Sequence, residues 1–518
     1  MAVVSIAVAG APPAGAARRI HARDVAEPTG STLPPTSADG YIDPTPGQVI
    51  AGFGASGAWW PSAAGQFPAD VQDQIGRLLF GPDGLRLSQY RYNIGGGGVG
   101  VTDAYKASPS FLTSSGSYDW DADPYGLVFL RQAHDYHVPT LIGFVNSAPP
   151  QFTSNGLSCG GLLVASAIPA YAQYLARVVD HLDSLGLRLS YVSPVNEPDT
   201  SQPKCRQEGM AVPVSERAAL VDAVAQAMQT TTAHPLVIAD ESSLVAELLA
   251  ELPQWLPEAG SAVAVVAHHT YDYPGTDLLE RLAQLPEPHW ATEICCFDGT
   301  RFGPGYDPTM VDGIWLADTI YDDLAVAHDS AFDWWVALSS NLGCDPTADP
   351  TCPYRAEPGG RNDGLVYFDP DWQADHDVNL FLTKRYWTLA SFSRFVRPGA
   401  VLHEITGLSG DVKAVAFARG KEWTVVAIND SVTEAERLTV HLPAGVDTTT
   451  AAAYLTDAGD NLARVDVDTT ASAAAFDLPP QSVVTVQLGP FAAGQSRLHP
   501  RDRHAGHRRT HSRTRTRS

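Results

Sequence analysis

The sequence lacks several features that would assign it to common classes of protein. It has no run of about 20 apolar residues, the length that a membrane-spanning helix requires. It has no Cys-x-x-Cys pair and no His cluster at ligand spacing, so we expect no catalytic metal. Its glycine run, Gly95 to Gly98, lacks the G-x-G-x-x-G spacing and the later acidic residue of a dinucleotide site. We therefore expect neither a membrane span nor a cofactor.

Positive charge is scarce outside the C-terminal end. The 518 residues contain 34 Lys and Arg against 58 Asp and Glu, a formal charge of −24. The tail after Leu488 holds eight Arg against one Asp, a net of +7, which leaves −31 for the rest. So acidic a body is not expected to bind nucleic acid or an anionic membrane. It would tolerate a neutral polysaccharide better than a polyanion.

Both ends of the chain have compositions typical of segments outside a folded core. Residues 2–9 are apolar and precede Ala14-Gly-Ala16, which suggests a secretory signal peptide whose basic start is missing. A disordered leader on a cytoplasmic protein is the alternative. We predict a truncated signal peptide and a disordered Pro, Ser and Thr-rich linker over residues 1–40, and a disordered basic tail over residues 491–518. The predicted location is extracellular.

The six cysteines fall into three pairs. Cys159 and Cys205 follow successive predicted strands, and Cys344 and Cys352 bracket a loop rich in Pro and Asp, so each pair could close a disulfide. Adjacent Cys295-Cys296 lies at the end of a predicted buried strand. Packing is the preferred interpretation there, and a vicinal disulfide is the alternative.

Hydrophobic periodicity divides the chain into two regions. Predicted helices at 71–80, 127–135, 168–185 and 215–230 alternate with predicted strands, among them 87–94, 139–145, 236–239, 262–268 and 332–338. After Pro398, short alternating runs without a long helical pattern predict an all-β sandwich. With 44% hydrophobic residues, the chain can bury one large core and a smaller one.

Two glutamates are predicted to follow strand ends. The apolar run from Leu189 is stopped by prolines, which places Glu197 directly after a strand and after Asn196. The strand-like run from His289 delivers Glu293. Either glutamate alone would more often be a cap, a surface charge or half of an ion pair. Two of them facing each other across a sugar are the minimum equipment for glycoside hydrolysis.

Several motifs together carry a family resemblance. They are Gly52-Phe-Gly-Ala-Ser-Gly-Ala-Trp-Trp60, Arg91-Tyr-Asn-Ile-Gly-Gly-Gly-Gly98, Asn146-Ser-Ala-Pro-Pro150, Asn196-Glu197-Pro198, His269-Thr-Tyr271 and Trp290-Ala-Thr-Glu293. Over about residues 41–490 the chain resembles glycoside hydrolase family 30, and within it the endo-β-1,6-galactanase-like branch. The resemblance implies a (β/α)8 TIM barrel over 51–397, fused to a C-terminal β-sandwich over 398–490 that the N-terminal strand 41–50 joins. It also implies a monomer acting on a β-linked polysaccharide.

The resemblance assigns roles to individual residues. Glu197 would be the acid/base and Glu293 the nucleophile of a double displacement with retention. Arg91 would form a hydrogen-bonded pair that lowers the pKa of Glu293, although an ordinary structural ion pair is the alternative. The predicted substrate-binding residues are Arg91, Asn196, His269, Tyr271, Trp59, Asn146 and Trp335.

Alternatives stay open on the sugar and on the tryptophans. Of Trp59 and Trp60 we expect one to meet sugar and one to pack, and strand alternation lets only one of Trp334 and Trp335 face the pocket. Many relatives have Trp where this chain has Gln151-Phe152, which leaves the sugar preference open. β-1,6-Glucanase, glucuronoxylanase or glucosylceramidase-like activity, or a non-catalytic carbohydrate-binding barrel, are the alternatives.

Overall fold

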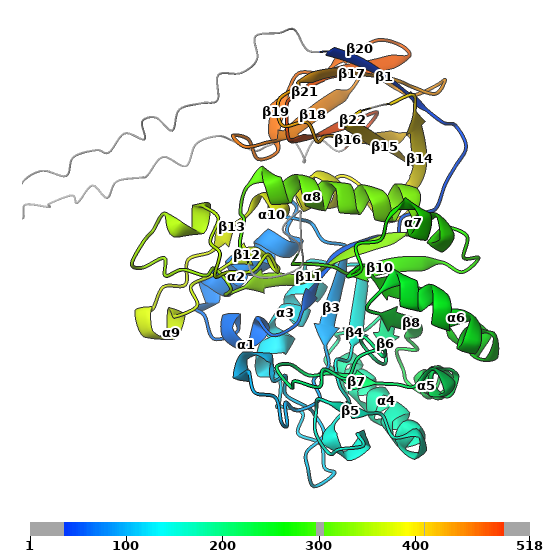
Figure 1. Cartoon of the computed structure of the whole chain (residues 1–518), viewed down its shortest axis with the longest axis vertical. Coiled ribbons are helices and arrows are strands. Elements are labelled where there is room, and N and C mark those ends of the chain that lie inside the picture. Colours follow the sequence, from blue (N-terminus) through cyan, green and yellow to red (C-terminus); the bar gives the residue numbers. More distant parts are fainter. Residues whose placement is uncertain (1–35, 297–304, 409, 492–518) are drawn as a thin grey trace, which may run out of the picture. The chain divides into compact units, whose positions relative to one another are not determined.

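The structure, a computed structural model, describes residues 36–296, 305–408 and 410–491. Eight parallel strands in this part of the chain close into a barrel, because β10 pairs with β11 as well as with β9 (Figure 1). In barrel order they are β2 (Gly52–Gly57), β3 (Gln89–Asn93), β4 (Thr140–Phe144), β6 (Tyr191–Ser193), β8 (Leu236–Ser242), β9 (Val265–His269), β10 (His289–Glu293) and β11 (Ala331–Ser339).

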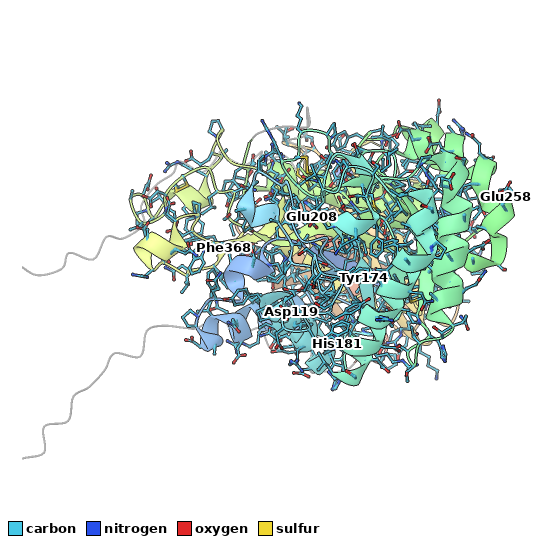
Figure 2. The ribbon with its side chains drawn as sticks, turned by 90° about the horizontal axis from the view of Figure 1, so that it is seen from below. Asp119, Tyr174, His181, Glu208, Glu258 and Phe368 are labelled. Atoms are coloured by element: carbon cyan, nitrogen blue, oxygen red, sulfur yellow. A yellow bond between two sulfur atoms is a disulfide. The ribbon has the colours of Figure 1, made fainter. Side chains whose placement is uncertain are left out.

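Helices follow the barrel strands and pack around them. They are α2 (Ala69–Phe80), α3 (Pro124–Asp135), α4 (Ile168–Ser184), α5 (Val214–Met228), α6 (Val245–Ala259), α7 (Thr276–Leu282), α8 (Met310–Tyr321) and α10 (Lys384–Ser393). The predicted (β/α)8 barrel is therefore confirmed. The loop that carries Asp119 packs on α4, where the Trp120 and His181 rings stack at 4.3 Å (Figure 2).

Successive side chains of a strand point alternately into the barrel and toward the surrounding helices. On β3, Tyr90 packs against Phe80 of α2, with ring centroids 5.4 Å apart. Its neighbour Arg91 points the opposite way and is fully buried among groups of other strands, Thr292 and Glu293 of β10 included. A buried guanidinium inside a barrel must be matched by buried acceptors. The polar interior of this barrel is consequently concentrated around Arg91.

The C-terminal strands form one ten-stranded sheet in the described residues, and it folds over a second core. The order is β19 (Ala463–Val465), β18 (Ala451–Thr456), β22 (Ser482–Leu488), β16 (Glu422–Asn429), β15 (Val412–Arg419), β14 (Val401–Thr406), β1 (Thr36–Ile42), β17 (Glu436–His441), β21 (Ala473–Leu478) and β20 (Asp468–Thr469). Apolar side chains from both halves of the sheet share that core, for example Ala427 with Phe476 and Val486. The predicted sandwich is confirmed.

The sandwich is joined to the barrel through α8 and α10. Lys413 of β15 pairs with Asp318 of α8 at 2.6 Å, and the Thr485 hydroxyl of β22 donates to the Ser391 carbonyl of α10 at 2.7 Å. These polar contacts supplement apolar packing between the two parts.

One predicted boundary is corrected. The N-terminal strand begins at Thr36, inside the segment predicted as linker, and its sequence of small and polar residues gives no strand signal of its own. It forms because β14 and β17 flank it on both sides. The predicted signal peptide and the predicted basic tail lie outside the described residues. No helix of the described residues is long and apolar enough to cross a membrane.

Candidate active site

A cleft of about 1070 Å³ lies over the carboxyl ends of the barrel strands. Five of the predicted site residues line it: Trp59, Glu197, Tyr271, Glu293 and Trp335. They come from four different strand ends and the segment after β2, and the closed barrel brings those ends to one face. Among the residues described, this is where carboxylates from separate strands meet an open cavity.

The two glutamates face each other across this cleft. One carboxylate oxygen of Glu197, one of Glu293 and a ring nitrogen of His269 all lie within 4.8 Å of one another. Glu197 is partly exposed, and its Oε2 accepts a hydrogen bond from the Gln202 side chain at 3.3 Å. Retaining glycosidases hold their two carboxyl groups about 5 Å apart, whereas inverting ones leave room for a water between them. The spacing here belongs to the retaining class.

Glu293 is held by donors on both oxygens. The Tyr271 hydroxyl donates to Oε1 at 2.9 Å, and Arg91 donates to Oε2 at 3.1 Å. The side chain is nearly buried, and burial raises the pKa of Glu293 while His269 and Arg91 oppose that rise. Arg91 does lower the pKa of Glu293, as predicted, but loss of water around the carboxyl outweighs the nearby cations and the net shift is upward.

Glu241, at the end of β8, organises the cations behind the cleft. Burial would raise its pKa, but Arg91 and His269 lower it to about 2. His269 donates to Glu241 at 3.0 Å, and the Thr292 hydroxyl donates to the same oxygen at 2.6 Å. From the sequence alone, a glutamate at a strand end is as well suited to cap the following helix as to contact substrate. The structure makes it the counter-ion that holds Arg91 and His269 in place.

His269 is an imidazolium at neutral pH. Although burial lowers its pKa, the carboxylates of Glu293, Glu197 and Glu241 raise it to about 10. Its Nδ1 lies 3.5 Å from Glu197 and 3.8 Å from Glu293, so its charge serves both. The trio also has the spacing of a metal-binding cluster, and in the charged imidazole both ring nitrogens are hydrogen-bond donors toward the carboxylates. We therefore read it as a carboxylate pair bridged by a cation.

The structure separates the paired aromatic residues that the sequence left open. Trp59 and Trp335 line the cleft and meet edge to face, with ring centroids 5.0 Å apart. Trp60 is buried and its indole N–H donates to the Ser56 carbonyl, while the indole N–H of Trp334 donates to the Asp363 carbonyl. One tryptophan of each pair therefore lies in the cleft and the other packs, as alternation predicts.

Two predicted substrate-binding amides lie behind the cleft wall. Asn196 is nearly buried and its Oδ1 accepts from Arg91 at 3.3 Å. Asn146 is farther away: its amide donates to Asn93 Oδ1 at 3.5 Å, and it is not among the residues that line the cavity. Neither amide is among the residues that line the cavity, so a direct contact with substrate stays a prediction for both.

Backbone strain gathers at the same place. Trp59, Glu197, Glu241 and Cys296 all have positive φ, between 48° and 69°, a conformation that residues with a Cβ rarely adopt. Such residues persist when the surrounding packing forces them and are concentrated at functional sites. Here the four lie at the ends of four barrel segments that meet at the cleft.

Sequence reasoning missed the basic residues of the cleft. Four cations line it, Lys106, Lys204, Arg206 and Arg361, although the body of the protein is strongly acidic. The ammonium of Lys106 lies 4.2 Å from the centre of the Trp59 ring. They belong to long loops after the strands, where no periodic signal places side chains. Their presence bears on which glycan fits.

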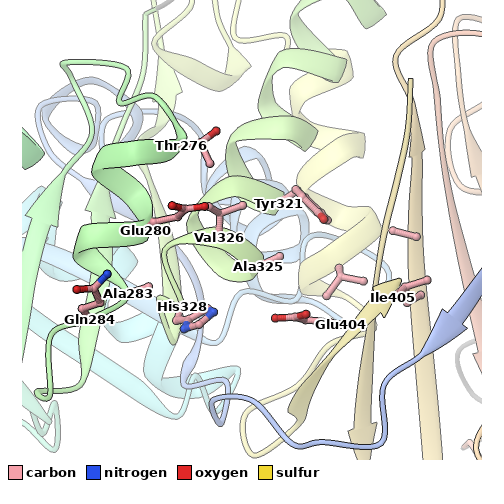
Figure 3. Close-up of a pocket in the computed structure, with 12 residues that line it drawn as sticks. Thr276, Glu280, Ala283, Gln284, Tyr321, Ala325, Val326, His328, Glu404 and Ile405 are labelled. Carbon is pink, nitrogen blue, oxygen red and sulfur yellow. The ribbon is translucent and has the colours of Figure 1, made fainter. Parts of the chain in front are cut away.

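A second hollow of about 550 Å³ lies away from the cleft, between α7 and strands β14 and β15 (Figure 3). Polar side chains such as Glu280, His328 and Glu404 line it. It holds no pair of carboxylates braced by cations. The cleft is therefore the better candidate for chemistry.

Comparison with known proteins agrees with this geometry. Residues 41–254 match the family described as O-glycosyl hydrolase family 30. The match covers the barrel strands β2, β3, β4, β6 and β8, and it includes Glu197 but not Glu293. A curated relative, the exo-β-1,6-galactobiohydrolase of Bifidobacterium longum subsp. longum, is 27% identical over 216 residues. That match covers 29% of this chain and 14% of the relative, so this chain spans only a small part of that protein's length.

Solved structures share the barrel and sandwich architecture. A conserved exported protein from Bacteroides fragilis superposes with a TM-score of 0.74 at 23% identity, covering 86% of this chain and 99% of its own. The catalytic domain of family 30 xylanase C from Talaromyces cellulolyticus gives 0.70 at 22% identity, covering 87% and 100%. At these identities the likeness establishes the barrel and sandwich fold.

Proposed function

We propose that this chain is a retaining glycoside hydrolase of family 30 that cleaves β-1,6-galactan, with Glu293 as nucleophile and Glu197 as acid/base. The observation that carries the proposal is the spacing of the two carboxylates across an open cleft. The resemblance to the endo-β-1,6-galactanase-like branch and the β-1,6-galactose linkage named for the Bifidobacterium relative favour galactan.

In the proposed mechanism, a Glu293 oxygen attacks the anomeric carbon while the glycosidic C–O bond breaks and Glu197 gives its proton to the leaving oxygen. In the second step Glu197 takes a proton from water, and the water oxygen displaces Glu293 from the anomeric carbon. His269 and Arg91 keep Glu293 ionised in a buried setting. Asn196, whose Oδ1 accepts from Arg91, would donate from its amide nitrogen to the 2-hydroxyl of the sugar, a contact that strengthens in the transition state.

The direct test is hydrolysis of β-1,6-galactan by the wild type, by Glu293→Gln and by Glu197→Gln. We expect Glu293→Gln to lower kcat by about 10³-fold or more, and Glu197→Gln by about 10²- to 10⁴-fold. Glu258→Gln, an exposed glutamate of α6, is the matched control and should leave kcat unchanged. If the wild type releases no reducing sugar while a glycan still binds, the protein is a non-catalytic carbohydrate-binding barrel.

Proton NMR of the first products tests the stereochemistry. Retention requires that the new reducing end forms as the β-anomer before it mutarotates. A product that first appears as the α-anomer would contradict double displacement. The lengths of the released oligosaccharides separate internal cleavage from release of disaccharides at a chain end.

The basic residues of the cleft favour a second candidate, a glycan that bears uronic acid. Arg206 and Arg361 are exposed in the cleft and would attract a carboxylate more strongly than a neutral sugar. The test compares galactan with and without glucuronosyl groups, and glucuronoxylan, as substrates. If the acidic glycan is preferred and Arg206→Gln/Arg361→Gln removes only that preference, the uronate candidate replaces the neutral one.

We also propose that the protein is secreted. Three disulfides form among the described residues, Cys159–Cys205, Cys295–Cys296 and Cys344–Cys352, and such bonds persist mainly in oxidising compartments. The two predicted pairs are confirmed, and at Cys295-Cys296 the alternative of a vicinal disulfide replaces simple packing. Recovery of the protein from the culture medium of its native host would test the proposal.

A further inference from the structure

The Cys295–Cys296 disulfide lies in the wall of the cleft, two residues after Glu293. Both cysteines line the cavity, although only 2% and 5% of their surfaces are exposed. Neither of the other two disulfides adjoins Glu293 in the sequence. Reduction of the Cys295–Cys296 disulfide would therefore change the immediate surroundings of Glu293, the candidate nucleophile.

The contacts of Cys295 lead directly to Glu293. The Tyr271 hydroxyl, which donates to Glu293 at 2.9 Å, also lies 3.8 Å from the Cys295 sulfur. The Tyr273 hydroxyl donates to the Cys295 carbonyl at 3.2 Å. Both tyrosines of the segment after β9 are thus placed against the disulfide. A shift of Cys295 would alter the hydrogen bond that Tyr271 makes to the carboxylate.

Cys296 is held in a conformation that the disulfide enforces. Its φ of 69° lies in the left-handed region, which a residue with a Cβ rarely adopts. Its N–H donates to the Asn362 carbonyl at 3.2 Å, in the segment between β11 and β12 (Gly364–Tyr367). A bond between neighbouring sulfurs closes a small covalent ring that leaves the backbone little freedom. Opening the ring would let Cys296 relax and move the chain behind Glu293.

We propose that the Cys295–Cys296 disulfide is a positioning element that keeps Tyr271 on Glu293, so that turnover requires the oxidised cysteines. This inference rests on the proposed function. A small dithiol reductant reaches the bond through the cleft: one thiolate attacks a sulfur, the S–S bond breaks, and two cysteine thiols form while the dithiol is oxidised to its cyclic disulfide. The two electrons gained by the protein are those lost by the dithiol.

The first experiment compares Cys295→Ala/Cys296→Ala with the matched control Cys344→Ala/Cys352→Ala. We expect kcat on β-1,6-galactan to fall at least tenfold in the first variant with little change in KM, and to stay at the wild-type value in the control. The acid limb of kcat/KM should move to higher pH, as in Tyr271→Phe, because the lost hydrogen bond favours the ionised carboxylate. Wild-type kcat and pH profile in the first variant would overturn the proposal.

The second experiment uses the reductant itself. Dithiothreitol should inhibit the wild type and the Cys344→Ala/Cys352→Ala control, and should have no effect on Cys295→Ala/Cys296→Ala; alkylation and mass spectrometry report which sulfurs were reduced. Equal inhibition of all three proteins would contradict the inference. Should the alanine variant fail to fold, reduction of the folded wild type decides alone.

A readout without substrate separates the two proposals. Carbon-13 NMR of labelled glutamate carboxyls, with Glu293→Gln for assignment, gives the titration midpoint of Glu293. We expect that midpoint to rise when Cys295–Cys296 is reduced or replaced. If the oxidised wild type hydrolyses no glycan, the proposed function fails, and the midpoint still decides the positioning role: an unchanged midpoint overturns it.

Discussion

The guanidinium of Arg91 is fully buried and touches groups from four other strands of the barrel. It lies 3.1 Å from Glu293 and 3.3 Å from Glu241, and it also donates to Asn196 and Ser56. Buried charges of this kind carry a large desolvation cost that only close partners offset. Arg91 therefore stabilises the interior of the barrel and also favours the ionised form of Glu293.

Replacing Arg91 by Met should leave two buried carboxylates without their main counter-ion. We expect a loss of about 3–5 kcal/mol in the free energy of unfolding, measured by urea titration with tryptophan fluorescence. Arg355→Met is the matched control, because Arg355 and its ion-pair partner Asp349 are exposed to solvent, which screens the pair, so the unfolding free energy should change little. Equal losses in the two variants would contradict a structural role for Arg91.

His269 predicts a specific dependence of stability on pH. Its pKa of about 10 in the folded protein exceeds the value of about 6.5 in an unfolded chain, so the folded state binds the proton more tightly. The stabilisation is fully present below pH 6.5 and is lost as pH rises through 10. The difference in unfolding free energy between wild type and His269→Asn should therefore shrink from pH 6 to pH 10.5.

The control for that series is His441→Asn, whose imidazole is exposed and pairs with Asp39. It should change the unfolding free energy little at any pH. A wild-type advantage over His269→Asn that grows with pH would show that His269 is not the proton-binding group.

For individual residues, the sequence identified the pair of carboxylates but not the buried residues that contact them. Glu197 and Glu293 were found because each follows a strand-like run, and strand ends meet on one face of a barrel. Glu241 has the same placement, yet nothing local distinguishes a counter-ion from a helix cap. Burial raises the pKa of Glu293. That burial comes from the packing of several strands, so no single segment of the sequence indicates it.

The loop after β3 depends on glycine for a reason that the structure supplies. The Gly96 and Gly98 N–H groups donate to the buried carboxyl of Glu208, which follows Cys205 in another loop (Figure 2). A Cβ added at Gly96 would lie 2.5 Å from the Ser147 carbonyl oxygen. Because these glycines have no side chain, the loop can pack closely against the segment after β4. The two segments together form part of the cleft wall.

Gly96→Ala should therefore force two backbone segments apart. We expect a loss of about 1–3 kcal/mol in unfolding free energy and a lower kcat, measured by urea unfolding and galactan hydrolysis. Gly459→Ala is the control, since the nearest atom to an added Cβ there is 3.7 Å away. A Gly96→Ala protein as stable as the control would mean that the loop has room to move.

Among the elements, helices were predicted better than the strands of the sandwich. The expected helix 168–185 is α4, Ile168–Ser184, because its apolar spacing is regular over several turns. Strand β21, Ala473–Leu478, was not predicted, since a run of alanines carries no strand preference. It is a strand because β17 pairs with it along its whole length. Pairing between distant segments is information that no local window contains.

For the whole molecule, the sandwich is completed by the first described strand of the chain. β1 pairs with β17 in parallel and with β14 in antiparallel register, so it lies inside the sheet. Ile42 of β1 belongs to the core of the sandwich. Without β1, two interior strands would become edges, and exposed edges promote aggregation.

A chain that begins at Asp43 should consequently be less stable than one that begins at Thr36. Burial of Ile42 alone contributes about 2 kcal/mol, and the lost strand pairing adds to it. Thermal unfolding and size-exclusion chromatography of the two chains measure the difference, with the longer chain as the control. Identical melting temperatures and elution profiles would show that β1 is dispensable.

The position of β1 also sets an order of assembly during synthesis. Tyr41 and Thr406, which face each other across β1 and β14, are 365 residues apart, so β1 has no partner until the distant strands that flank it have been synthesised. Contacts this distant in sequence are slow to form, and long unpaired intermediates are prone to misassociate. Strands that are adjacent in the barrel follow one another along the chain, so the barrel can fold first. Pairing of β1 with β14 and β17 would then be the last step. A circular permutant in which β1 follows β22 would synthesise β1 after both of its partner strands and would remove that wait.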